Sequence, residues 1–306
     1  MRVPALSMIH FPTPGRSRET ARPFLFPAVA LLLLFTLFPF AFTVALTLSR
    51  VSLVGGLQLQ FAGASNWVRL VTDGRFWTSV RNTIAIVLAS VSLEFVLGMA
   101  LALLLYAPLR AGGVFRVLFI IPMTLTPIAI GYMWRMIYDE SIGPLNAILR
   151  EVGLVPVGWV SGTHMPLVSI IITNVWHWTP FLFVLLLAGL RGIPTEVVEA
   201  AQIDGASGVQ IFRYVLMPML TPTALAAVLL RSLEAFKIVD EIFIITGGGP
   251  GTRTESLTLQ AYYVGLLSFD LAYGATVAMG LFLLVVMAAM VFLSITRRTR
   301  EGEEHP

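Results

Sequence analysis

The sequence predicts an all-α polytopic membrane protein with six transmembrane helices. Of its 306 residues, 57% are hydrophobic and only 12% are charged, whereas soluble proteins average about 45–50% and about 25%. Several apolar stretches also reach the roughly 20 residues that a helix needs to cross a bilayer. Length alone would fit two soluble domains, but this composition predicts one membrane domain whose surface largely meets lipid.

Six segments of the chain are apolar enough to cross a bilayer. In chain order they are residues 23–49, 82–109, 117–134, 167–190, 214–230 and 271–296. Only Glu94 interrupts the second segment, and the fifth is the weakest because it runs on into a charged stretch. Six such segments in one chain are not expected of buried helices in a soluble protein. They predict a transmembrane domain over residues 23–296.

The arginines predict how the chain is oriented. They are more frequent on the side that would carry both termini, in residues 2–22, 110–116, 191–213 and 297–300. Since basic residues stay on the cytoplasmic side, both termini and the connection between helices four and five are predicted to be cytoplasmic. Residues 1–22 are expected to be a disordered tail, because their prolines and arginines cannot bury a core. A second short tail is expected over residues 297–306, and the first apolar run is too long for a cleaved signal.

Several classes of function are disfavoured by what the sequence lacks. It has no cysteine, and its formal charge of +3 is too small to suggest nucleic-acid binding. No H-E-x-x-H motif is present, so neither a metal site nor a catalytic set is expected. The chain has no G-x-x-x-x-G-K-[ST] phosphate loop, and "TGGGPGT" is better explained as a flexible outer turn. We therefore expect a chain that is not an enzyme and holds no cofactor. The histidines are scattered, at His10, His164, His177 and His305.

A polar insert, residues 191–218, separates the fourth and fifth apolar segments. Its stretch "EVVEAAQIDGASGVQIFRYVLMP" predicts a short helix, a break at Gly205-Ala206-Ser207-Gly208, and a second short helix. Gly205 permits a sharp turn because it has no Cβ, and Pro218 marks the start of the next membrane helix. Glu199 and Asp204 offer charge to a partner. From these residues alone, a docking surface and a connector lying on the membrane remain equally open.

The same insert closely resembles the EAA loop of binding-protein-dependent ABC importer permeases. The resemblance rests on Glu199-Ala200-Ala201, on Gly205 after three intervening residues, and on Leu216-Met217-Pro218. The stretches "AGLRGIPTEVVEAAQIDGAS", "FKIVDEIFIITGGGPGTRTESL" and "FRVLFIIPMTLTP" resemble the carbohydrate-uptake branch, at the position of the larger maltose-type channel subunit. The similarity covers about residues 80–295. Met217 departs from the pattern, since the family usually has leucine before the proline.

This resemblance implies a fold, a function and a set of partners. The fold would be the type I permease fold of ABC importers, in a bacterial or archaeal plasma (inner) membrane. The chain would carry a sugar or polyol into the cytoplasm as one half of a heterodimer with a second permease. An ATPase dimer, holding ATP and Mg, and an extracytoplasmic solute-binding protein would complete the complex. In this family the EAA loop sits in a groove of the ATPase, which implies a coupling role for Glu199, Ala200, Ala201, Asp204, Gly205 and Pro218.

Hydropathy alone leaves a second class of transporter open. An ion-coupled secondary transporter of a polar solute would also have many spans, with charged residues at the membrane midplane. It would have no reason to carry an EAA loop. A requirement for ATP and partner subunits separates the two classes.

The stretch "TNVWHWTPFLF" in helix four predicts a substrate contact. Asn174, His177, Trp178 and Phe181 share one side of a helix, and amides and aromatic faces are the groups that bind sugars. For an aromatic pair in a membrane helix taken alone, a belt at the membrane interface is the commoner explanation. The resemblance implies sugar-contacting positions at Asn174 and Phe181, and further ones in helix three at Met123 and at the Thr126-Pro127 step.

Helix five ends in a run of charged residues. At 1.5 Å per residue from Pro218, Arg231 lies about 20 Å and Glu234 about 24 Å along the helix, in the outer half of a core about 30 Å thick. With Lys237 they are spaced to pair along one face. A solvated end of a helix that emerges early would explain this run. A polar strip lining a water-filled cavity is favoured, because charges within a membrane seldom face lipid.

Overall fold

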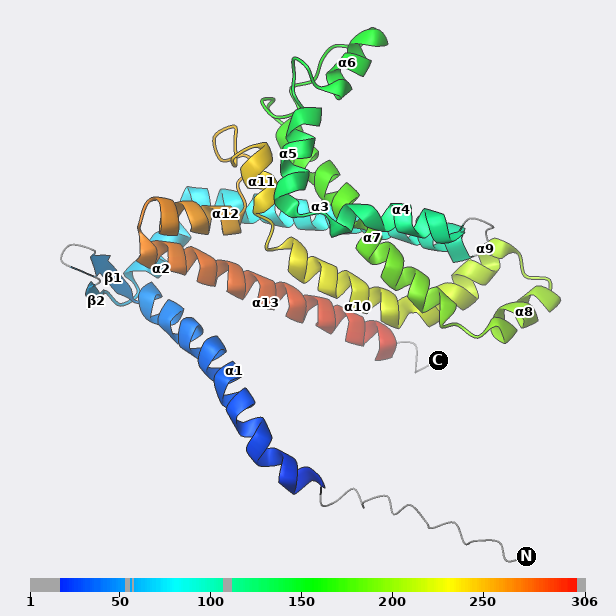
Figure 1. The fold of residues 1–306 in the computed structure, drawn as a ribbon, viewed down its shortest axis with the longest axis horizontal. Helices are drawn as coiled ribbons and strands as arrows, with labels where there is room; N and C mark the ends of the chain where they lie inside the picture. Colours follow the sequence, from blue (N-terminus) through cyan, green and yellow to red (C-terminus); the bar gives the residue numbers. More distant parts are fainter. Residues whose placement is uncertain (1–16, 53–55, 57, 107–111, 302–306) are drawn as a thin grey trace, which may run out of the picture.

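The computed structural model describes residues 17–52, 56, 58–106 and 112–301. Within these ranges the chain is helical, apart from loops and one hairpin of two antiparallel strands (Figure 1). By length and composition, five of the described helices are able to cross a membrane, and a sharply bent pair of shorter helices brings the number to six if the pair counts as one broken span. The predicted all-α membrane fold is therefore confirmed.

The helices follow the apolar segments closely, with short elements in the connections. The hairpin is formed by β1 (Ser49–Ser52) and β2 (Gln58–Phe61), and two π-helical turns are η1 (Phe212–Leu216) and η2 (Tyr263–Leu267). The α-helices are α1 (Ser17–Thr47), α2 (Ser65–Thr72), α3 (Gly74–Tyr106), α4 (Gly112–Thr124), α5 (Pro127–Ile137), α6 (Pro144–Glu151), α7 (Met165–Arg191), α8 (Thr195–Ile203), α9 (Gly208–Ile211), α10 (Met217–Ala235), α11 (Asp240–Ile245), α12 (Leu257–Tyr262) and α13 (Leu271–Glu301).

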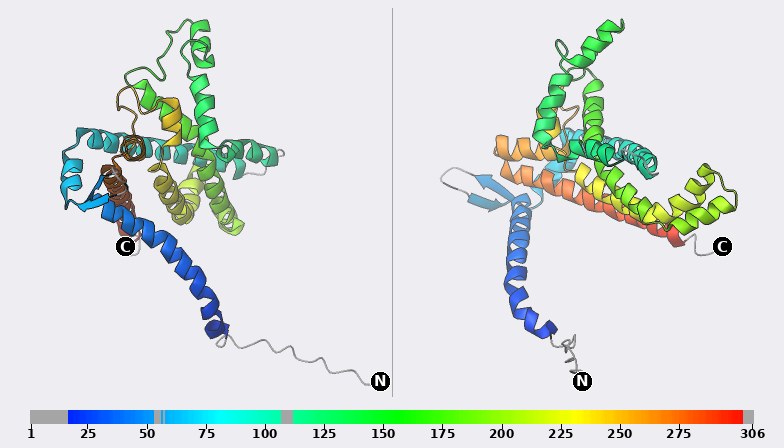
Figure 2. Two further views of the ribbon diagram at one scale, coloured as in Figure 1. Left: turned by 60° about the vertical axis from the view of Figure 1, so that its left-hand side comes forward. Right: turned by 45° about the vertical axis from the view of Figure 1, so that its right-hand side comes forward.

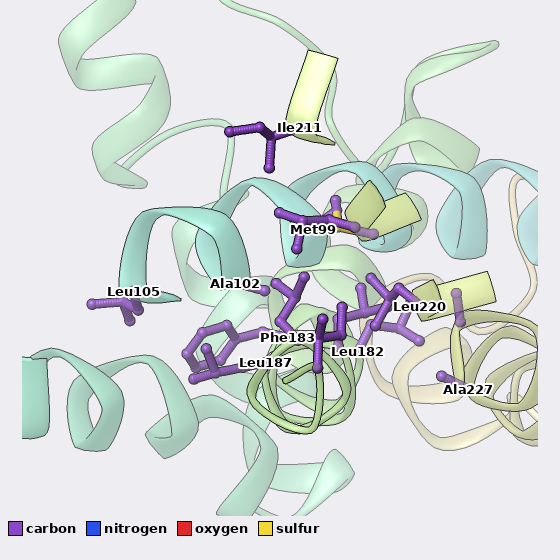
Figure 3. Packing of buried hydrophobic residues seen from close by; sticks show 14 residues of the cluster. Met99, Ala102, Leu105, Leu182, Phe183, Leu187, Ile211, Leu220 and Ala227 are labelled. Atoms are coloured by element: carbon purple, nitrogen blue, oxygen red, sulfur yellow. The ribbon is translucent and has the colours of Figure 1, made fainter. Parts of the chain in front are cut away.

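The centre of the bundle is formed by α3 and α7, with α10 packed against both. Figure 3 shows the apolar cluster between them, in which Met99, Phe183 and Leu220 are buried. A Cβ at Gly98 would lie 3.0 Å from the backbone nitrogen of Phe183, so glycine permits α3 and α7 to approach closely. Small residues at helix contacts are the usual means of packing helices in a membrane.

The first helix stands apart from this bundle. Figure 1 and Figure 2 show that α1 approaches the other helices only at its C-terminal end, near α13, and that its N-terminal part projects away from them. From Phe26 onward its apolar side chains are mostly exposed, as are many of those on α13. In a bilayer these faces would contact lipid or another subunit, because neither is covered within the described chain.

The third apolar segment is not the single helix that its hydropathy predicted. It is divided into α4 and α5, whose axes are bent by 96°. Pro127 has no amide hydrogen to continue the ladder of α4, and its ring disfavours helical geometry at the preceding residue. Thr126 accordingly has extended backbone angles, with φ −71° and ψ 140°.

The second short helix of the polar insert also differs from the prediction. It is not separate from the fifth span, because α9, η1 and α10 run on as one helix from residue 208 to 235. Pro218 lies inside this helix. The π-helical turn precedes it, and the amide of Met217 donates to the carbonyl of Phe212, five residues back. This wider turn lets the helix pass the proline without a break.

The terminal helices begin and end outside the predicted domain limits. The first starts at Ser17 rather than at residue 23, and the last runs to Glu301 rather than to residue 296. The rest of the two predicted tails, residues 1–16 and 302–306, lies outside the described residues.

Candidate functional site

Five buried polar side chains form one connected network in the middle of the bundle. No member is more than 3% exposed. The five come from four helices: Glu94 from α3, Asn174 and His177 from α7, Arg231 from α10 and Glu241 from α11.

The centre of the network is an ion pair between Arg231 and Glu94. Nε of Arg231 lies 2.7 Å from Oε2 of Glu94, and Nη2 lies 2.8 Å from Oε1. Such two-point contacts between guanidinium and carboxylate are strong and fix the orientation of both groups. Because neither charge reaches solvent, each is tolerated at this depth only through its partner.

Asn174 connects this pair to the other acid of the network. Its Oδ1 accepts a hydrogen bond from Nη2 of Arg231, and its Nδ2 donates to Oε2 of Glu241 over 2.8 Å. The other oxygen of Glu241 lies 2.6 Å from Nδ1 of His177. One amide side chain on α7 is thus held in place by α10 on one side and by α11 on the other.

A pocket of about 170 Å³ opens beside the network. Asn174, Trp178 and Arg231 form its inner wall, and the guanidinium carbon of Arg231 lies 4.8 Å from the centre of the Trp178 ring. An amide, an aromatic face and charged groups meet here, and these groups suit a solute that carries both hydroxyl groups and C–H faces. The other lining residues are Pro127, Glu234, Ala235, Lys237, Ile238, Val239, Asp240 and Glu241.

The residues predicted for a substrate site are only partly together. Asn174, Trp178, Arg231 and Glu234 line the pocket. His177 is buried against Glu241.

The other three do not line this pocket. Phe181 packs edge-on against Trp178 at 6.2 Å, next to the apolar cluster. Met123 lies near the end of α4, and Thr126 lies at the bend before α5. The bend brings the neighbouring Pro127 to the pocket instead.

The charged run at the end of helix five does not pair along one face as predicted. Nζ of Lys237 contacts Oε1 of Glu234 at 2.8 Å, and both side chains are more than half exposed. Arg231 instead turns inward to Glu94. The prediction that Arg231, Glu234 and Lys237 pair with one another is therefore wrong for Arg231. Its partner is the buried carboxylate of Glu94 on α3.

Two network residues were absent from the predicted site. Glu94 was visible as the one charge in residues 82–109, and a lone charge within a span signals a buried partner. Glu241 lies at the far end of the charged run that follows helix five. Its hydrogen-bonded partners, Asn174 and His177, are more than 60 residues away in the chain, so no local pattern joins them.

The polar insert forms an elbow of α8 and α9 that projects from one end of the bundle (Figure 2). No residue of α8 is buried, although Val198 and Ala201 pack against the apolar cluster. Glu199, Ala200 and Asp204 are exposed.

The turn predicted at Gly205 is present, with φ +80°. Apart from its two neighbours in the chain, no atom of the described residues lies within 4 Å of where its Cβ would be, so space beside this turn is open to another molecule. The next helix is fixed by a capping box in which the backbone nitrogen of Ser207 donates to Oε1 of Gln210 over 2.8 Å. Exposed apolar side chains flank the turn, with Ile203 87% and Val209 76% exposed. The elbow therefore combines a rigid frame with a mixed apolar and charged surface.

Comparison with known proteins identifies the family of this chain. Residues 94–300 match the family model described as "Binding-protein-dependent transport system inner membrane component". The trehalose/maltose transport system permease protein MalF of Thermococcus litoralis is 35% identical over 276 residues, which cover 90% of this chain and 92% of that protein. The trehalose transport system permease protein SugA of Mycobacterium tuberculosis is 32% identical over 280 residues, 91% of this chain and 89% of that protein.

A solved structure shows the same fold. A chain of a bacterial alginate ABC transporter, crystallised with its alginate pentasaccharide-bound periplasmic protein, superposes with a TM-score of 0.80 at 18% identity. The superposition covers 93% of this chain and 96% of that chain. The predicted resemblance is thus confirmed, and the chain belongs to the inner membrane components of binding-protein-dependent transport systems, which are the permease subunits of ABC importers.

Proposed function

We propose that this chain forms one half of the translocation pathway of an importer for a neutral sugar or polyol. The observation that carries the proposal is the pocket beside Asn174 and Trp178, where an amide and an aromatic face meet among paired charges. Amides bond sugar hydroxyls, and aromatic rings stack on sugar C–H faces. Relatives named for trehalose and maltose support the same class of substrate.

The size of the pocket supports a need for a second subunit. A volume of about 170 Å³ is well below the 300–1,000 Å³ that is typical of ligand sites. A second permease would supply the opposite wall of the pathway in a heterodimer. Movement of α7 against α10 would then widen or narrow the shared space.

The elbow of α8 and α9 is proposed as the contact with a separate ATPase dimer, which would hold ATP and Mg. Glu199, Ala200 and Asp204 would face the ATPase groove, and the open side of Gly205 would admit the surface of the ATPase. Ala201 would contribute by holding α8 against the apolar cluster of the bundle. Pro218 lies on the helix that continues from the elbow towards the pocket. Closure of the ATPase dimer would therefore push on a rigid helical connection rather than on a loop.

This proposal fixes an orientation in the plasma (inner) membrane. The elbow and the C-terminal end of α13 lie towards the same end of the bundle in Figure 1, which suits a cytoplasmic position for both. The N-terminus is proposed to be cytoplasmic as well. A solute-binding protein would dock on the opposite side of the membrane, where the connections after α1 and α5 are proposed to lie.

The buried Glu94, Arg231 and Glu241 also suit the alternative of an ion-coupled secondary transporter, since such groups form ion pathways in membranes. Reconstitution with the partner permease, ATPase and binding protein separates the two. The proposed importer takes up labelled disaccharide only with internal ATP and binding protein. Uptake that follows an ion gradient without ATP would contradict the proposal and support the alternative.

A further inference from the structure

The two cations at the pocket are both paired with carboxylates. Lys237 contacts Glu234 at the exposed rim, and Arg231 contacts Glu94 in the interior. The two pairs differ in position. In the first pair, Glu234 and Lys237 both line the pocket. In the second pair only Arg231 lines it, and Glu94 lies behind Arg231, fully buried.

Glu94 therefore contacts no solute in the pocket and acts on it from behind, through the guanidinium of Arg231. Its two oxygens accept from Nε and Nη2, which neutralises the charge that Arg231 would otherwise present to a solute. The same contact keeps Nη2 in place against Oδ1 of Asn174. Electrostatic attraction is stronger where water is excluded. A guanidinium without a carboxylate partner in such a site would therefore favour a solute that carries a carboxylate or phosphate.

We propose that Glu94 is a specificity-determining positioning residue, which holds Arg231 neutralised and so keeps the pocket selective for uncharged over anionic sugars. This inference rests on the proposed function of the pocket as a sugar contact. It assigns a role to a residue that does not itself reach the solute. Neutralising Glu94 removes one negative charge next to Arg231, while Glu234, Asp240 and Glu241 still line the pocket. An anionic solute should therefore gain affinity relative to a neutral solute of the same shape.

Two probes of matched shape test the inference: 4-nitrophenyl β-glucoside, which is neutral, and 4-nitrophenyl β-glucuronide, which carries a carboxylate. Equilibrium dialysis against the purified permease–ATPase complex, without binding protein, gives the ratio of their dissociation constants. Glu94→Gln is expected to shift this ratio at least tenfold towards the glucuronide. Glu94→Asp keeps the charge and is expected to stay within about twofold of the unmodified complex, in which the glucoside binds at least as well.

A matched control is available elsewhere in the chain. Glu255 also has a buried carboxylate that contacts an arginine, Arg75, through both oxygens, and neither residue lines the pocket. Glu255→Gln should therefore not change the ratio. A general loosening of the fold by loss of a buried acid would move both variants equally.

The outcomes distinguish this inference from the proposal on which it rests. If the unmodified complex binds neither probe, the pocket is not a sugar contact and both ideas fail. If it binds the glucoside and Glu94→Gln leaves the ratio unchanged, only the role of Glu94 is overturned. Should Glu94→Gln not assemble, Glu94→Asp decides: a tenfold shift despite the retained charge would contradict the charge-based explanation.

Discussion

Replacing Arg231 by methionine should destabilise the protein far more than the loss of one surface charge. The change leaves the carboxylate of Glu94 fully buried without its two-point partner. Opposite charges about 4 Å apart attract by about 4 kcal/mol at an effective dielectric of about 20. Removing one member of a buried pair costs about 3–5 kcal/mol, and loss of the contact with the Trp178 ring adds about 1 kcal/mol.

The measurement is thermal unfolding of the purified complex in detergent, in a double-mutant cycle. Arg231→Met and Glu94→Leu should each lower the Tm by on the order of 10 °C. The double variant, which buries no unpaired charge, should recover a large part of that loss. Lys237→Met removes the exposed partner of Glu234 and is the control, with an expected cost of about 1 kcal/mol or less. If the loss of stability in the double variant equals the sum of the two single losses to within about 0.5 kcal/mol, the two residues are not coupled and the reasoning is refuted.

Two further predictions concern transport. Asn174→Ala removes the amide that joins Arg231 to Glu241, at a cost of about 1–3 kcal/mol. It should slow uptake roughly tenfold or more while the complex still assembles. Unchanged uptake kinetics across a full substrate titration would remove Asn174 from the pathway. Deleting residues 2–15, which precede α1, should leave uptake nearly intact, and loss of the assembled complex in that truncation would contradict the expectation of a dispensable tail.

Hydropathy was sufficient to predict the long helices, because each of them is apolar over the thickness of a bilayer. The bend in the third span could have been anticipated from Thr126-Pro127, since proline restricts the residue before it. Its direction could not, because it depends on packing of α5 against α11. The side chain of Ile244 would lie 2.8 Å from a Cβ placed at Gly131, so this close contact is specified by residues far apart in the chain.

The buried network was predictable only in part. Asn174 and His177 were recognised by their position on one helix face, and Glu94 was visible as an isolated charge. The pairing of Glu94 with Arg231 joins residues 137 positions apart, and the sequence offered Glu234 as a nearer partner for Arg231. Desolvation decided the outcome: the exposed pair at the rim satisfies itself, and the buried carboxylate requires the arginine.

In the polar insert, residues 191–218, local sequence predicted the turn but not the unbroken helix that follows it. The turn at Gly205 followed from the absence of a Cβ, and it is present with a positive φ. Pro218 suggested a break before the fifth span. The π-helical turn over Phe212–Leu216 removes the need for that break, and such a turn has no signal in the periodicity of the side chains.

The most direct test of the account is the number of solute molecules imported per ATP hydrolysed, measured together with co-purification of the ATPase. Gly205→Asp places a side chain at φ +80° in the open space beside the turn, and Glu199→Lys reverses an exposed charge on α8. Both variants should insert normally, because neither residue lies within a span. We predict that each loses the ATPase on extraction, or keeps it and hydrolyses ATP without import. Unmodified values of both quantities for Gly205→Asp would contradict the claim that this elbow transmits ATP hydrolysis to the pathway.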